Sequence, residues 1–158
     1  MRSDSVKNMS AYADQNHAPS LTDVRLELKG RIHMILIIGG AYQGKLEFAR
    51  QLKGTDVTVS DGRTISLDLL AASDMITHFH EVIRRLWLKK REISAVIEEV
   101  LAKNPDITIV MDEIGYGVVP MSAEDREYRE LVGHTGQLLA RQAEAVYRVV
   151  CGIGTRIK

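Results

Sequence analysis

A glycine-rich segment at residues 39–45, with the sequence Gly-Gly-Ala-Tyr-Gln-Gly-Lys, constrains the fold of this chain more than any other feature. It follows an apolar run at residues 35–38 and precedes residues 46–50, which contain no helix-breaking residue. A strand, a glycine-rich turn and a helix in this order are typical of a P-loop, in which backbone N–H groups and the helix N-terminus together bind an anion. We therefore predict a nucleotide-phosphate site here. The alternative is an ordinary glycine-rich turn.

The P-loop interpretation gives the end of this segment specific roles. Lys45 would reach the β- and γ-phosphates of ATP or GTP and act as a catalytic residue. The next residue is Leu46, where the full motif has a Ser or Thr whose hydroxyl binds Mg²⁺. Because leucine has no metal-binding atom, we expect the Mg²⁺ cofactor to be held weakly, and nucleotide binding is predicted better than phosphoryl transfer. The predicted nucleotide-binding residues are Gly39, Gly40, Ala41, Tyr42, Gln43, Gly44, Lys45, Leu46 and Asp61, for which a simple turn with Gly62 is the alternative.

A second half of the site follows the apolar run at residues 107–111, which ends in Asp112 and Glu113. A buried strand that ends in two carboxylates is typical of the Walker B element of P-loop proteins. Ligands of open α/β sheets bind at the carboxyl ends of strands, although alternation along the strand puts only one of the two acids directly over the P-loop. We predict that Asp112 holds Mg²⁺ through water and that Glu113 acts catalytically on an acceptor hydroxyl. The alternative is a solvated strand end.

Short apolar runs alternate with helical patterns along residues 34–158. This alternation predicts an α/β fold, a P-loop NTPase-like parallel sheet with flanking helices in a single domain. We expect strands, all buried on both faces, at residues 35–38, 57–59, 107–111 and 146–151. We expect amphipathic helices at residues 79–87 and 93–101, and a third that Ser122 caps through Asp125 and that runs toward Ala145. Residues 1–33 are polar and lack periodicity, and we expect them to form a disordered N-terminal extension.

Charge and composition exclude several kinds of partner. The 21 basic residues balance the 21 acidic residues, so the chain lacks the positive surface that a nucleic acid partner requires. No run reaches the roughly 20 apolar residues that span a membrane. Cys151 is the single cysteine and cannot form an intramolecular disulfide, which favours a reducing, cytoplasmic location. The neutral net charge permits a homo-oligomer without requiring one.

The glycine-rich segment and the later sequence DEIGYGVVP, at residues 112–120, resemble the adenosylcobinamide kinase / adenosylcobinamide-phosphate guanylyltransferase family of cobalamin biosynthesis. Within the second segment, the residues in register with the family signature are Glu113, Gly115, Gly117, Val119 and Pro120. The similarity continues through Arg126, Tyr128, Arg129, Glu130, Gly133, Gln137, Leu139 and Ala140 to residues 149–153 and 157–158. The resemblance is loose over residues 34–61 and close over residues 107–158.

This resemblance implies two steps: phosphorylation of the aminopropanol hydroxyl of adenosylcobinamide, then guanylyl transfer through a covalent guanylylated histidine. In the family that histidine lies in a long segment after the second strand. The segment is missing here, so we expect the second step to be lost. His78 and His80 are possible substitutes, but residues two apart on a helix point about 200° from each other, which favours flanking or helix-capping roles. His134 stands where the family has an arginine.

Three functions remain open at this point, and with them the question whether the chain is an enzyme. The first is a shortened kinase of the family, with a nucleotide and a corrinoid as ligands. The second is a non-catalytic or regulatory nucleotide-binding protein, which Leu46 and the missing histidine favour. The third is a kinase for another small hydroxylated molecule. The resemblance also implies a homo-oligomer.

Overall fold

Six strands form one sheet in the part of the chain that the computed structural model describes, residues 33–115, 117 and 122–158. In the order of the sheet, they are β2 (Val59–Asp61), β3 (Met75–Thr77), β4 (Thr108–Asp112), β1 (Ile35–Gly39), β5 (Ala145–Val150) and β6 (Ile153–Arg156). Neighbouring strands are parallel except β5 and β6, which are antiparallel. The predicted α/β class with a parallel sheet is confirmed, and one antiparallel edge strand is added to it.

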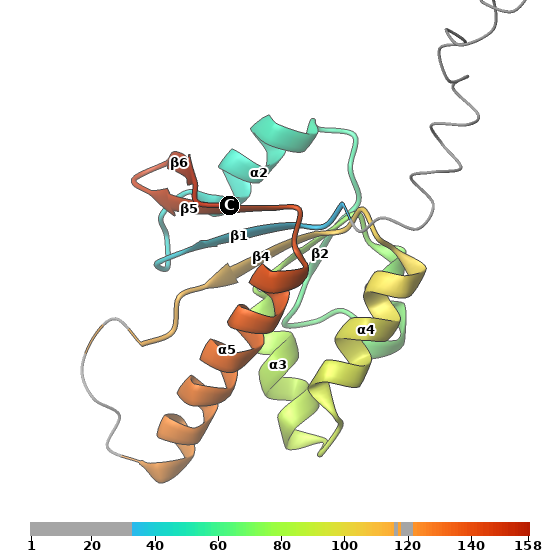
Figure 1. Cartoon of the computed structure of the whole chain (residues 1–158), viewed down its shortest axis with the longest axis vertical. Coiled ribbons are helices and arrows are strands. Elements are labelled where there is room, and N and C mark those ends of the chain that lie inside the picture. Colours follow the sequence, from blue (N-terminus) through green and yellow to red (C-terminus); the bar gives the residue numbers. More distant parts are fainter. Residues whose placement is uncertain (1–32, 116, 118–121) are drawn as a thin grey trace, which may run out of the picture. The chain divides into compact units, whose positions relative to one another are not determined.

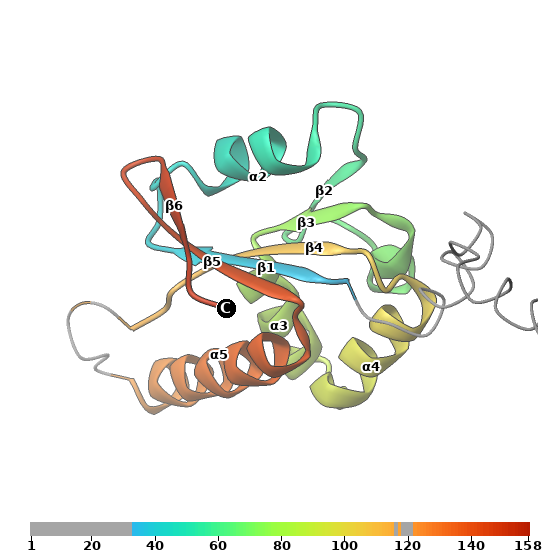
Figure 2. The same ribbon diagram turned by 45° about the horizontal axis from the view of Figure 1, so that its top comes forward.

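Helices cover both faces of this sheet. The helix α2 (Lys45–Lys53) lies on one face, and α3 (Phe79–Leu88), α4 (Ile93–Lys103) and α5 (Ala123–Gln142) lie on the other (Figure 1, Figure 2). A short 3-10 helix, η1 (Leu67–Ala72), connects β2 to β3. Ser122 caps α5 as predicted, because its hydroxyl accepts a hydrogen bond from the Asp125 N–H at 3.0 Å. The two predicted amphipathic helices are confirmed as α3 and α4.

The pleat of the central strands divides their side chains between two hydrophobic clusters. The larger cluster, which α3, α4 and α5 complete, takes Leu36, Ile109 and Met111 from these strands. The smaller cluster, on the side of α2, takes Ile37 and Val110. Because side chains alternate along a strand, Asp112 lies on the same face as Val110, whereas the next residue, Glu113, is directed to the opposite face. The P-loop and α2 cover the face that Asp112 shares.

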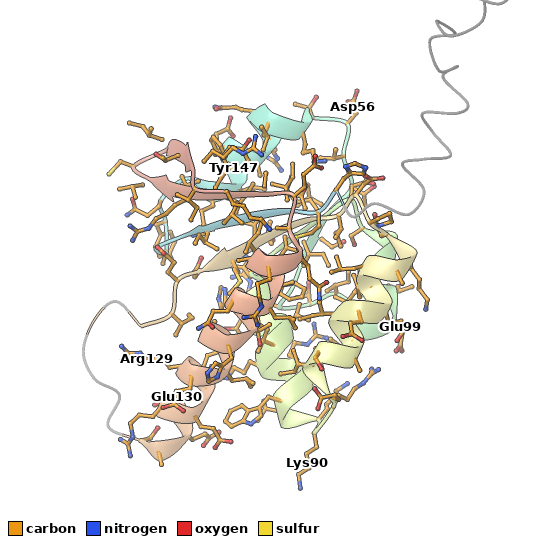
Figure 3. All side chains as sticks on the ribbon, in the orientation of Figure 1. Asp56, Lys90, Glu99, Arg129, Glu130 and Tyr147 are labelled. Atoms are coloured by element: carbon orange, nitrogen blue, oxygen red, sulfur yellow. The ribbon has the colours of Figure 1, made fainter. Side chains whose placement is uncertain are left out.

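The helix α2 is anchored on the sheet by its own apolar residues. Ala49 is fully buried, and the ring of Phe48 lies 5.4 Å from the ring of Tyr147 on β5. Figure 3 labels Tyr147 near α2. The edge strand β6 carries Gly154 against the same phenyl ring, and a Cβ atom at this position would collide with it. The two C-terminal strands therefore fix the position of the helix that follows the P-loop.

Several strand expectations need correction. The strand β2 begins at Val59 rather than at residue 57, and all of its residues are only partly buried because it is an edge strand. The strand β5 is buried at its start but ends at the half-exposed Val150. The strands β3 and β6 are absent from the prediction. The strand β3 has only three residues, and its apolar Met75 and Ile76 directly precede the helical pattern of α3.

Part of the predicted organisation lies outside the described residues. The expected disordered extension is one such case, since only His33 of residues 1–33 is described. Val119 and Pro120 of the second family signature are two more. Within the described chain, no helix is both long enough and apolar enough to cross a membrane.

Candidate functional site

The carboxyl ends of β1, β3 and β4 open onto a cleft of about 730 Å³. One wall is formed by the P-loop and the first turns of α2, and the other by the β3–α3 junction together with Arg63. This is the edge of the sheet at which open α/β proteins bind their ligands. The lining residues that carry its chemistry are Lys45, Leu46, Arg50, Arg63, His80 and Asp112.

The P-loop is tied to the turn between β5 and β6. Gly44 has a φ of 85°, in the left-handed region that favours glycine, and a Cβ atom there would lie 3.1 Å from the Cα atom of Gly152. Gln43 holds the loop at two points. Its backbone oxygen accepts a hydrogen bond from the Gly152 N–H at 2.8 Å, and its side-chain oxygen accepts one from the Cys151 N–H at 2.6 Å. The shape of the loop therefore depends on a hairpin at the other end of the described chain.

The residues predicted to bind nucleotide fall into two groups. Residues 41–46 all line the cleft, and the Tyr42 side chain among them is fully exposed. Gly39, Gly40 and Asp61 are described but do not belong to the lining. A Cβ atom on Gly39 would collide with the backbone oxygen of Val149 on β5. That glycine is therefore needed where β1 leaves the sheet.

Lys45 and Asp112 form the centre of the cleft. The Lys45 side chain is only 8% exposed, and its Nζ donates a hydrogen bond to the backbone oxygen of Gly40 at 2.6 Å. The same Nζ lies 2.7 Å from Oδ1 of Asp112, whose side chain is 19% exposed. An ion pair with this little solvent around it is weakly screened. The structure thus brings together the P-loop lysine and the first of the two predicted carboxylates.

Glu113 is held outside the cleft. Its Oε1 lies 3.1 Å from Nε of Arg148 on β5, and its backbone N–H donates to the Gly39 oxygen at 3.0 Å. It is not among the residues that line the cleft. Of the two acids at the end of β4, only Asp112 therefore faces the P-loop, as the alternation of side chains along a strand requires.

The two histidines at the β3–α3 junction are arranged differently from the helical expectation. His78 precedes α3 and has a φ of 49°, a left-handed conformation, and its side chain makes no capping hydrogen bond. Its ring therefore lies 5.9 Å from the ring of His80, in an edge-to-face arrangement. The prediction that the two residues diverge around one helix is wrong, because only His80 belongs to α3. Both line the cleft.

His80 is fixed in one tautomer by its neighbours. Its Nδ1 accepts a hydrogen bond from the backbone N–H of Asp112 at 3.1 Å, so the proton of the neutral ring is on Nε2. Nε2 lies 3.9 Å from Oδ2 of Asp112 and 3.8 Å from Oε1 of Glu81. The hydroxyl of Tyr128 on α5 donates to the His80 backbone oxygen at 2.8 Å. Burial lowers the pKa of His80 despite the two nearby carboxylates, which favours the neutral ring.

Asp61 positions a cation of the cleft. Both of its carboxylate oxygens accept from the Arg63 guanidinium, and Nη2 lies 2.5 Å from Oδ2. These hydrogen bonds lower the pKa of Asp61 to about 2. Nδ1 of His78 lies 3.2 Å from Oδ1 of the same carboxylate. Arg63 lines the cleft and Asp61 does not, so the observed contact of Asp61 is with Arg63, and its contact with a nucleotide stays a prediction.

The buried, neutral His80 predicts a specific pH dependence of stability. The unfolded chain binds a proton at His80 near pH 6.5, whereas the folded chain resists it. The stability contributed by the neutral ring is therefore present above pH 6.5 and is lost as the pH falls from 6.5 toward the lowered pKa.

We expect His80→Gln to reduce the difference in unfolding free energy between pH 7.5 and pH 5.5, measured by urea denaturation. His134→Gln, an exposed change on α5, is the control and should leave that difference as it is in the wild type. An equal pH dependence in wild type and His80→Gln would contradict the assignment.

A comparison with protein families matches most of this fold. The model of the family described as cobinamide kinase / cobinamide phosphate guanyltransferase matches residues 68–157, which is more than half of the chain. The matched region begins after β2 and includes both histidines of the cleft, Asp112 and the hairpin that holds the P-loop. The P-loop itself precedes it.

Two curated relatives support the same family. The chain is 37% identical over 67 residues to the bifunctional adenosylcobalamin biosynthesis protein CobU of Escherichia coli strain K12, which covers 42% of this chain and 37% of that protein. It is 40% identical over 52 residues to the protein of the same name from Salmonella typhimurium strain LT2, covering 33% of this chain and 29% of that protein. The matches thus span about a third of these relatives. On the extent of the family match, the chain belongs to the cobinamide kinase / cobinamide phosphate guanyltransferase family.

Proposed function

We propose that the cleft binds the phosphates of ATP or GTP and that the chain phosphorylates a cobinamide-type hydroxyl in cobalamin biosynthesis. The observation that carries this proposal is the position of Lys45, whose Nζ lies inside the cleft between the backbone oxygen of Gly40 and Asp112. A lysine at the start of a helix, beneath a glycine-rich loop, is suited to hold the β- and γ-phosphates. Membership of the family supports the class of acceptor.

The proposed reaction needs few groups from the protein. The acceptor hydroxyl oxygen forms a bond to the γ-phosphorus, the bond to the β-phosphate oxygen breaks, and ADP or GDP leaves while the hydroxyl proton passes to a base or to water. Lys45 would stabilise the charge on the phosphates, with Arg50 and Arg63 in the same cleft. The Nε2–H of His80 would donate a hydrogen bond toward the cleft. Glu113 would reach the acceptor hydroxyl only after release from Arg148. Of the two acids, the geometry therefore favours Asp112 as the one that lies near the acceptor.

A second candidate is a nucleotide-binding protein without catalysis. The observation in its favour is Leu46, which lines the cleft where a P-loop kinase presents a metal-binding hydroxyl. Binding alone would need the loop and Lys45, whereas transfer also needs an acceptor in line with the γ-phosphate. Turnover of cobinamide separates the two candidates.

One incubation tests both steps of the family reaction. With ATP or GTP and cobinamide, we expect mass spectrometry to detect phosphorylated cobinamide. We expect no GMP attached to the protein when GTP is added, because attack on the α-phosphate requires a nitrogen lone pair. Nε2 of His80 carries the ring proton, and Nδ1 faces the Asp112 N–H. Lys45→Ala is the control for the first product. A GMP adduct that disappears in His78→Gln or in His80→Gln would contradict the second expectation. Binding of nucleotide without any phosphorylated product would favour the non-catalytic candidate.

A further inference from the structure

The cleft does not offer Mg²⁺ the ligands that P-loop enzymes use. In those enzymes the residue after the lysine supplies a hydroxyl oxygen and the acid at the strand end supplies a carboxylate. Here the first is Leu46, an aliphatic side chain within the lining. Among the described residues, no group of three or more His, Cys, Asp or Glu side chains is disposed to hold a metal ion. Mg²⁺ at phosphate sites is held by one or two carboxylates together with phosphate oxygens and water. This cleft lacks the hydroxyl ligand, and its carboxylates Glu47, Glu81 and Asp112 do not form a group that holds an ion.

Asp112, the Walker B carboxylate that faces the cleft, is already paired with a cation of the protein, Lys45. Oδ1 of Asp112 lies 2.7 Å from Nζ of Lys45, and the two side chains are 19% and 8% exposed. The other oxygen, Oδ2, lies on the side of the His80 Nε2–H. One oxygen of Asp112 is therefore paired with a cation of the protein, and the other lies 3.9 Å from Nε2 of His80. The charge that Asp112 neutralises is that of the Lys45 ammonium group.

We infer that this cleft binds nucleotide phosphates without a magnesium ion held by the protein, and that Asp112 serves as the resident counter-ion of Lys45. The inference rests on the proposed function, since it concerns the same phosphates. On binding, a phosphate replaces Asp112 as the partner of Lys45, and Arg50 and Arg63 in the lining add positive charge. The Asp112 carboxylate then lies next to an anion and opposes its binding.

This role predicts an effect of Asp112 opposite in sign to that of a metal ligand. Removing the charge of a metal ligand weakens nucleotide binding when Mg²⁺ is present. Removing the charge of a counter-ion frees Lys45 and takes an anion away from the phosphates, so binding becomes tighter when no metal is present. Asp112→Asn makes this change. It keeps the size of the side chain and the hydrogen bond that the backbone N–H of residue 112 donates to His80.

The test is calorimetric titration with ATP and with GTP, in EDTA and in excess Mg²⁺. For the wild type we expect dissociation constants that differ by less than about five-fold between the two conditions, and for Asp112→Asn a dissociation constant in EDTA about ten-fold lower than that of the wild type. Asp68→Asn, the same chemical change at a side chain 87% exposed on η1, is the matched control and should bind like the wild type. The wild-type comparison needs no variant, so it stands even if Asp112→Asn folds poorly.

The outcomes separate this inference from the proposed function. Wild-type binding that requires Mg²⁺, or that weakens in Asp112→Asn when Mg²⁺ is present, overturns the counter-ion role while nucleotide binding itself stands. Absence of binding for the wild type and both variants, in either condition, refutes the proposed function and the inference with it. Binding in EDTA that Asp112→Asn tightens and Asp68→Asn leaves unchanged supports both.

Discussion

Replacing Lys45 by alanine is expected to lower the affinity for ATP and GTP about 100-fold, because a charge-assisted hydrogen bond to a phosphate contributes roughly 1.5–3 kcal/mol. The substitution has a second effect in this protein. It leaves Asp112, whose carboxylate lies 2.7 Å from the ammonium group, without that partner beside the phosphates. The phosphates then lose the attraction of Lys45 while the repulsion from Asp112 remains, so this substitution should have the largest effect on binding of any single change in the cleft.

The measurement is calorimetric titration with both nucleotides, together with a thermal unfolding curve for each protein. Lys53→Ala removes the same charge from the exposed end of α2 and is the matched control, with affinity expected near that of the wild type. The double variant Lys45→Ala/Asp112→Asn should recover part of the lost affinity, because the uncompensated carboxylate is gone. Equal affinity of wild type and a folded Lys45→Ala variant would refute the P-loop assignment.

Substitution of Gly62 by alanine is expected to destabilise the fold strongly. Gly62 is buried, and a Cβ atom there would lie 2.5 Å from the His78 oxygen and 2.8 Å from the Thr77 oxygen. Both are backbone atoms, which cannot rotate out of the way. The Gly62 N–H donates to the Thr77 oxygen at 2.8 Å, and its own oxygen accepts from Nη1 of Arg85 at 2.8 Å. We expect a loss of about 3 kcal/mol, the upper end of the range for overpacking, and a fall in thermal midpoint of about 10 °C.

Gly133→Ala provides the matched control for this prediction. Gly133 is exposed in the middle of α5, and a Cβ atom there meets no other atom within 4 Å. Since glycine is unfavourable inside a helix, this change should raise stability by about 0.5–1 kcal/mol. Urea denaturation of the two variants and the wild type decides the matter. If the Gly62→Ala protein is as stable as the wild type, the turn after β2 is not packed closely against the β3–α3 junction.

The sequence predicts well those parts of the site that are local in the chain. Hydrophobic runs locate β1 and β4, glycines mark the loop between β1 and α2, and alternation along β4 predicts that only one of two neighbouring acids faces the P-loop. The same periodicity identifies α3 and α4, and a Ser122–Asp125 pair marks the start of α5. Each of these signals involves residues a few positions apart, and each reflects backbone geometry that short segments adopt by themselves.

The opposite wall of the cleft could not be predicted in this way. The strand β3 is only three residues long, so no periodicity distinguishes it from the start of α3. Had it been recognised as a strand, His78 and His80 would have been placed at the ligand edge of the sheet, directly after its carboxyl end. Arg63 likewise carries no motif, and its orientation follows from hydrogen bonds to Asp61 at an edge strand whose end the sequence misplaces.

By itself, then, the sequence determined the α/β class, the P-loop and the two elements that bracket it, because local propensity and side-chain periodicity decide such features. Only the tertiary structure decided what each polar group faces. Pairing of β4 between β1 and β3 brings Asp112 to Lys45 and to the His80 ring. Glu113 meets Arg148 of β5, the strand on the other side of β1. The β5–β6 hairpin holds Gln43 from 108 residues away. Such contacts join residues remote in the chain, and which partners meet depends on strand order, which no short stretch of sequence encodes.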